Sequence, residues 1–62
     1  MKSKQVMKVD MFGRKFIVLQ NFGSDFEFRV FEVFPDFRND YHVGSFKSFQ
    51  EAWTFIELEL WN

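Results

Sequence analysis

The chain has 62 residues, of which 23% are aromatic, with a formal net charge of −1, no cysteine and one histidine. A single domain of this length buries only about 60% of the surface of its unfolded chain, and the missing cysteines exclude disulfides as a supplement to its core. No apolar run approaches the roughly 20 residues of a membrane span, and residues 1–5 do not lead into the apolar stretch of a secretory signal. We therefore expect a cytoplasmic domain that makes no membrane contact.

Charge is unevenly distributed along the chain. Residues 1–15 carry five basic side chains against one acid, a net of +4, whereas residues 16–62 carry three basic side chains against eight acids, a net of −5. Such a dipole is able to steer a charged partner or to align two copies head to tail, and it is also typical of an ordinary solvated surface.

The first half of the chain predicts a flexible basic end over residues 1–5, followed by a single domain over residues 6–62. Residues 6–11 alternate apolar and polar side chains, as a half-buried strand does. A glycine-containing turn over residues 12–15 then leads into residues 16–22, a nearly continuous apolar run of strand length. Both faces of this second strand require cover.

A third strand is expected after the turn at residues 23–25. It begins with alternating side chains, but the alternation changes phase at Val30 and Phe31, which indicates either a β-bulge or burial of both faces. Pro35 lacks a backbone donor, so the strand should end near Phe34. Residues 36–40 form the next turn, and residues 41–43 predict a short fourth strand that ends at Gly44.

A helix closes the chain. Ser48 and Glu51 are spaced as a capping box, in which the serine hydroxyl accepts from the amide of Glu51 and the glutamate reaches back to the amide of Ser48. The helix should then run over residues 49–60. The predicted fold is α+β, a three- to four-stranded antiparallel meander with this C-terminal helix packed on one face; the pattern does not decide whether the fourth strand forms or which face the helix covers.

Catalytic and metal-binding patterns are not found in the sequence. His42 is the single candidate base and no spacing ties it to a nucleophile. Zinc requires a fuller set of ligands than His42 with Asp36 and Asp40 provides, and the three glycines are isolated turn residues that form no phosphate-binding loop. We therefore expect no enzyme activity, no cofactor and no metal.

The aromatic and aliphatic side chains exceed what one helix and one sheet face can bury. Helical periodicity places one stripe toward the sheet, and the predicted core also includes Phe16, Phe26 and Phe28. The stripe consists of Phe49, Ala52, Trp53, Ile56 and Leu60. A second set lies on the other side of the helix or on a second sheet face, and we predict it to be a protein interface. This set consists of Phe55, Leu58, Trp61, Ile17, Leu19, Phe31 and Val33.

The helix also lacks a positive charge. Glu51, Glu57 and Glu59 have no basic partner within it, and the last two lie near the negative end of its dipole. We expect a basic surface from elsewhere to offset them.

The leading functional prediction is a non-catalytic protein-binding module, either a homodimer or an accessory or inhibitory protein that docks on a larger host protein. In size and in its lack of motifs, the chain resembles the short accessory proteins that phages and mobile elements encode, a resemblance of type that identifies no family. The alternative is a single-stranded nucleic-acid-binding protein that uses a basic and aromatic hairpin tip over residues 12–16. Its predicted contacts are Lys8, Phe12, Arg14 and Lys15.

Overall fold

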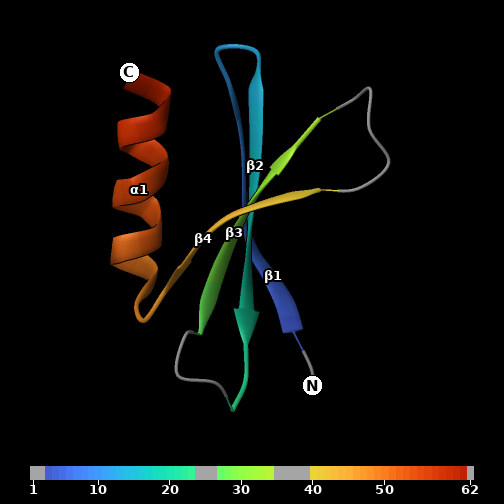
Figure 1. Ribbon diagram of the computed structural model, residues 1–62, viewed down its shortest axis with the longest axis vertical. Helices are drawn as coiled ribbons and strands as arrows, with labels where there is room; N and C mark the ends of the chain where they lie inside the picture. The colour runs from blue at the N-terminus through green and yellow to red at the C-terminus, as the bar shows by residue number, and fades with distance from the viewer. Residues whose placement is uncertain (1–2, 24–26, 35–39, 62) are drawn as a thin grey trace.

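Four antiparallel strands in sequence order form one sheet, and a C-terminal helix packs on one of its faces (Figure 1). A computed structural model describes residues 3–23, 27–34 and 40–61. The α+β meander is thereby confirmed, with all four strands present. The elements are β1 (Ser3–Met11), β2 (Arg14–Asn21), β3 (Phe28–Val33), β4 (Tyr41–Phe46) and α1 (Phe49–Trp61).

Strand β1 is longer than the sequence pattern predicts. Its pairing with β2 begins at Ser3 opposite Asn21, so residues 3–5 of the expected flexible end belong to the sheet. Residues 1 and 2 of that end lie outside the described residues. A register shift between Gln5 and Met7 leaves Val6 as an extra residue in β1, and Val6 packs against the core.

Strand β4 carries the irregularity that the change of phase in β3 indicates. The β2–β3 ladder is continuous from Lys15 opposite Val33 to Gln20 opposite Phe28. In the β3–β4 ladder, Val30 pairs with Gly44 but Phe31 pairs with His42, so the extra residue is Val43 of β4. Strand β4 also continues through Gly44 to Phe46, and the prediction that Gly44 ends the strand is wrong.

The core lies between α1 and the face of the sheet that the helix covers. Its buried hydrophobic residues are Val9, Phe16, Val18, Val30, Ala52 and Ile56. Phe28 and Trp53 pack against this cluster as expected. Phe49 is exposed at the start of α1 and touches only the edge of the core, where its ring makes an edge-on contact with Phe28 at 6.0 Å between centroids. Phe26 lies outside the described residues.

The start of α1 follows the capping pattern with one change. The Ser48 hydroxyl accepts from the Glu51 amide at 3.2 Å, as predicted. The Glu51 carboxylate accepts from the amide of Lys47 at 3.4 Å, one residue before the predicted donor. The helix continues one residue beyond its expected end, to Trp61.

Gly44 is required by the aromatic ring that packs over it. A Cβ atom at this position would lie 2.8 Å from Cε2 and 2.9 Å from Cζ of Phe46, whose ring centroid lies 5.3 Å from that of Phe55. We expect Gly44→Ala to displace the Phe46 ring and to lower the free energy of unfolding by about 1–3 kcal/mol, the usual cost of overpacking. Urea denaturation measures the change.

Phe46→Leu provides the control for this prediction, because a smaller side chain leaves room for the added methyl group. Gly44→Ala should therefore cost less than about 1 kcal/mol when it is introduced into the Phe46→Leu protein. An equal cost in both backgrounds would show that the Phe46 ring is not the reason for glycine at this position.

Candidate protein-binding surface

The predicted helix interface is only partly exposed. Leu58 and Trp61 project from α1 with 63% and 73% of their surfaces accessible. Phe55 does not accompany them: it is half-buried and packs against the core, where it meets the ring of Phe46. Phe55 is thus less exposed than Leu58 and Trp61, because α1 packs against β4 as well as β3 and β2, but it still lines an open groove together with Leu58.

Trp61 instead has an aromatic neighbour that sequence spacing does not reveal. The ring of Phe12, in the turn between β1 and β2, meets the Trp61 ring edge-on with 5.5 Å between centroids and 61° between planes. Phe12 is itself 64% exposed. Phe12, one of the predicted nucleic-acid contacts, thus lies in one exposed cluster with Leu58 and Trp61. We call this cluster the aromatic end of the molecule.

The backbone of Phe12 is strained. Phe12 and Gly13 both have positive φ, 54° and 74°, as the two central residues of a tight hairpin turn require. Glycine and asparagine adopt such angles readily, whereas a bulky residue there is strained by about 1–3 kcal/mol. Folding alone would favour a smaller residue at position 12, so the exposed Phe12 ring points to a role outside the core.

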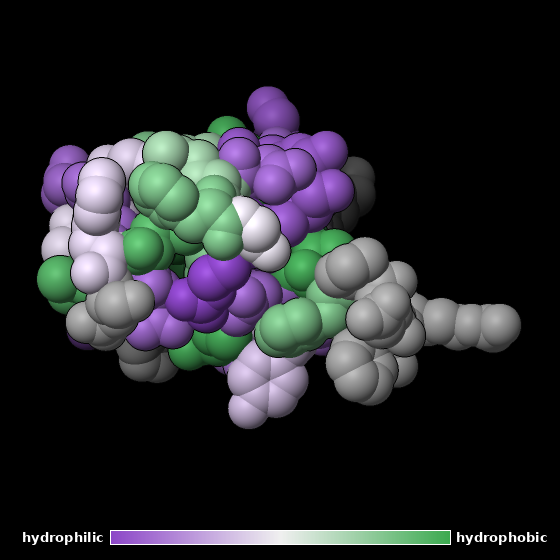
Figure 2. Space-filling view, turned by 90° about the horizontal axis from the view of Figure 1, so that it is seen from above, coloured by the Kyte–Doolittle hydropathy of each residue, from purple (hydrophilic) through white to green (hydrophobic). Residues whose placement is uncertain are grey.

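An open groove lies beside the aromatic end, between the end of β4 and the outer side of α1. It has a volume of about 390 Å³, enough for one or two side chains of a partner. Phe46, Phe55 and Leu58 provide its apolar lining, and Gln50, Glu51 and Thr54 provide its polar lining. Figure 2 views the molecule from the end where α1 finishes and β1 turns into β2, and it shows hydrophobic atoms at the surface among hydrophilic ones.

Arg14 anchors the helix to the sheet beneath the aromatic end. Its guanidinium donates to both carboxylate oxygens of Glu32, at 2.9 and 2.8 Å, and to the backbone carbonyl of Glu59 at 2.9 Å. It also lies 3.5 Å from the Glu59 carboxylate and 5.0 Å from the centre of the Phe16 ring. The positive charge that the acidic helix lacks is thus supplied by the chain itself, at the negative end of the helix dipole.

The hydrogen bond to Glu32 raises the pKa of Arg14, and the nearby charges of Glu32 and Glu59 act in the same direction. A basic group whose pKa is raised by folding stabilises the fold below its unfolded pKa and loses that contribution only as the pH rises through its folded pKa. The Arg14 contribution is therefore constant across the neutral range and is lost only in strong alkali.

The predicted nucleic-acid contacts do not form a single hairpin tip. Arg14 faces α1 and is engaged by Glu32 and Glu59. Phe12 packs on Trp61. Lys8 pairs with Ile17, and Lys15 pairs with Val33, so both lysines lie on the sheet face that α1 does not cover. The basic and aromatic residues of the hairpin are thereby divided between two faces.

The remaining predicted interface residues share the open face of the sheet, the face away from α1. Ile17 pairs with Phe31 across β2 and β3, and Leu19 and Val33 lie on the same side of these strands. All four side chains are half-buried, and they are less accessible than those of the aromatic end. Within residues 3–23, 27–34 and 40–61, no helix or strand covers them (Figure 1).

Among the described groups with catalytic chemistry, one base and one hydroxyl meet on β4, where His42 Nε2 lies 2.9 Å from the Ser45 hydroxyl. No three His, Cys, Asp or Glu side chains among the described residues are placed to hold a metal ion. In the same residues, no helix has the length and apolar character needed to cross a membrane.

Comparisons with known proteins give no relative. The chain matches no protein-family model, and no curated protein or solved structure is detectably similar to it.

Proposed function

We propose that the chain is a cytoplasmic, non-catalytic protein-binding module that docks on a larger protein as an accessory or inhibitory partner. The observation that carries the proposal is the aromatic end, where Phe12, Leu58 and Trp61 are each more than 60% exposed. Clustered apolar side chains of this size mark interaction surfaces on small proteins, and tryptophan is enriched among the residues that dominate binding energy.

Backbone strain at Phe12 supports the same reading. A strained residue persists when the surrounding structure holds it or when its position serves a function. The Phe12 ring makes an exposed contact with Trp61, worth about 0.5–1.5 kcal/mol, which does not exceed the strain. Binding of a partner across both rings supplies a further reason for phenylalanine in this turn.

Charge around the surface indicates what the partner presents. α1 contains three glutamates and no basic residue. Glu59 is engaged by Arg14, whereas Glu51 lines the groove and Glu57 is half-buried on the helix. Two copies that met helix to helix would bring these like charges together, which is unfavourable. We therefore expect a partner with an apolar pocket for Trp61 and basic residues around it, in preference to a symmetric homodimer.

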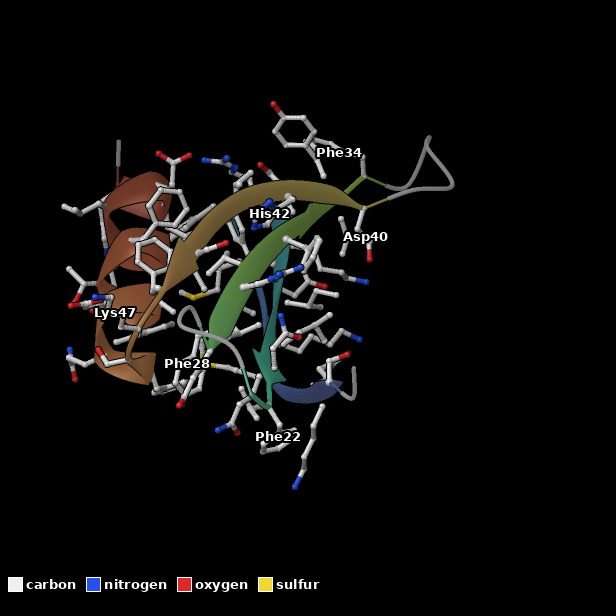
Figure 3. All side chains as sticks on the ribbon, turned by 60° about the horizontal axis from the view of Figure 1, so that its bottom comes forward. Phe22, Phe28, Phe34, Asp40, His42 and Lys47 are labelled. Atoms are coloured by element: carbon white, nitrogen blue, oxygen red, sulfur yellow. The ribbon has the colours of Figure 1, made fainter. Side chains whose placement is uncertain are left out.

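Trp61→Ala tests the proposal against Phe22→Ala as the matched control. Phe22 is also exposed, at 52%, but it follows the opposite end of β2 from the hairpin turn (Figure 3). Both variants should fold as the parent does. Trp61→Ala should weaken partner binding by about 30-fold or more, the effect of removing a hot-spot residue, while Phe22→Ala should bind normally.

The measurement combines capture from a host lysate by tagged parent and variant proteins with sedimentation of the free chain. A partner captured by the parent and by Phe22→Ala but lost with Trp61→Ala supports docking on a larger protein. A concentration-dependent dimer abolished by Trp61→Ala identifies a second copy as the occupant. Unfolding of Trp61→Ala, or identical behaviour of both variants, would overturn the assignment of this surface.

A further inference from the structure

A second surface, on the opposite side of the molecule, has a different chemistry. The open face of the sheet carries an apolar centre, in which Ile17 pairs with Phe31 and Leu19 pairs with Arg29. Polar side chains of β1 and β4 flank this centre on the same face: Lys8 of β1 pairs with Ile17, and Ser45 of β4 pairs with Arg29. The side chains of these pairs alternate with the core residues and point away from α1.

The irregularity in β4 brings two polar side chains together on this face. Residues three apart on a regular strand point to opposite faces, but the extra residue Val43 changes the phase between His42 and Ser45. His42 Nε2 consequently lies 2.9 Å from the Ser45 hydroxyl. The His42 ring also packs against Phe31, with 5.1 Å between ring centroids. Bulges often redirect side chains in this way at functional sites.

Arg29 adds an unused donor beside this pair. Its Nε is buried and has no hydrogen-bond partner among the described residues, although a buried N–H normally has one. Arg29 lies opposite Ser45 in the β3–β4 ladder. Because Nε is closed to solvent, the terminal nitrogens of this guanidinium are the ones that, with the Ser45 hydroxyl, form a suitable site for a phosphate oxygen.

The open face of the sheet and the helix differ in the charges that they carry. The open face presents Lys8, Lys15 and Arg29 against Asp10, which lies opposite Lys15, and the exposed Asp40 directly precedes β4 (Figure 3). The helix on the other side carries only acidic charges. An anionic ligand is therefore attracted to the open face and repelled from the helix, even though the whole chain has a net charge of −1.

We propose that the open face binds single-stranded nucleic acid. Unpaired bases stack on the Phe31 and His42 rings, and the phosphates are held by Lys8, Lys15 and the Arg29–Ser45 pair. Aromatic side chains flanked by cations on a sheet are the usual means of binding single strands, whereas a duplex hides its base faces; here the His42 ring is exposed and the Phe31 ring is half-buried. This site shares no residue with the aromatic end.

Fluorescence anisotropy of labelled oligo(U) and oligo(dT) strands tests the proposal on the full chain. Three cations on phosphate predict that affinity falls by about 100-fold between 20 and 200 mM salt. Phe31→Leu keeps an apolar side chain in the sheet and should weaken binding by about tenfold through lost stacking. Arg29→Gln should weaken it and reduce the salt dependence.

Lys8→Gln and Lys4→Gln form a matched pair within β1. Both lysines are exposed. Lys4, however, pairs with Gln20, and Gln20 pairs with Phe28, so these side chains lie on the helix side of the sheet. Lys8→Gln should therefore reduce the slope of log affinity against log salt by about 0.7, while Lys4→Gln should leave affinity nearly unchanged.

Three outcomes would overturn the proposal. They are the absence of binding at 20 mM salt, equal effects of Lys8→Gln and Lys4→Gln, and self-association of the free chain that Lys8→Gln or Arg29→Gln abolishes without any oligonucleotide binding. The last would assign the open face to the acidic helix of a second copy. Circular dichroism establishes that each variant is folded, and the two lysine variants decide the question even if Phe31→Leu unfolds.

Discussion

Phe16→Ala should remove a large part of the stability of the fold at 25 °C, whereas Phe22→Ala should fold normally. The side chain of Phe16 is fully buried, with 0% of its surface accessible. It lies under the guanidinium of Arg14 and packs within the core formed by β1, β2, β3 and α1. Its removal should cost about 3–5 kcal/mol, the usual cost of truncating a buried phenylalanine. A domain of this length has only about 3–9 kcal/mol of total stability.

Thermal and urea unfolding followed by circular dichroism compare the two variants with the parent. Phe22 is half exposed and lies outside the core cluster, so its truncation should change the free energy of unfolding by less than about 1 kcal/mol. Equal destabilisation by both substitutions would mean that the stability of this fold depends on general aromatic content and not on the core between α1 and the sheet.

Local pattern was sufficient to predict most of the fold. Each useful pattern depends only on residues that are neighbours in the chain, which a short sequence window contains. These patterns are the alternation over residues 6–11, the continuous apolar run after the first turn and the capping residues before α1. The same patterns identified Phe16, Ile56 and the exposed Leu58 and Trp61 correctly. They also indicated a phase change near Val30, although the extra residue is in β4.

Contacts between distant segments could not be predicted in this way. Helical periodicity alone does not include the ring of Phe46, which packs against Phe55 and leaves it half-buried. The meeting of Phe12 with Trp61 depends on the hairpin turn reaching the end of α1, and no spacing encodes that distance. The uncompensated acids of the helix were a usable signal for a basic partner, but they did not identify Arg14.

Loss of Arg14 alone should destabilise the fold, whereas replacing Arg14 and Glu32 together should cost little. Glu32 is a core-facing carboxylate with only 9% of its side chain accessible, and Arg14 supplies its hydrogen bonds. Arg14→Met therefore leaves a buried charge unpaired and the Glu59 carbonyl without its donor. Loss of one partner of a buried pair costs about 3–5 kcal/mol. Because 35% of the Arg14 side chain is accessible and water can replace part of the interaction, we expect about 2–3 kcal/mol here.

The double variant Arg14→Met with Glu32→Met should recover most of that loss, to within about 1 kcal/mol of the parent, because apolar side chains of similar volume replace a buried ion pair at little net cost. Urea denaturation of the parent, both single variants and the double variant completes a double-mutant cycle. If the double variant were as unstable as Arg14→Met alone, the main contribution of Arg14 would be its contact with the end of α1 at Glu59. Recovery of stability in the double variant would instead assign the loss to the unpaired Glu32 charge. The double variant would then be a folded chain that keeps the aromatic end and the open face but lacks the Arg14 guanidinium.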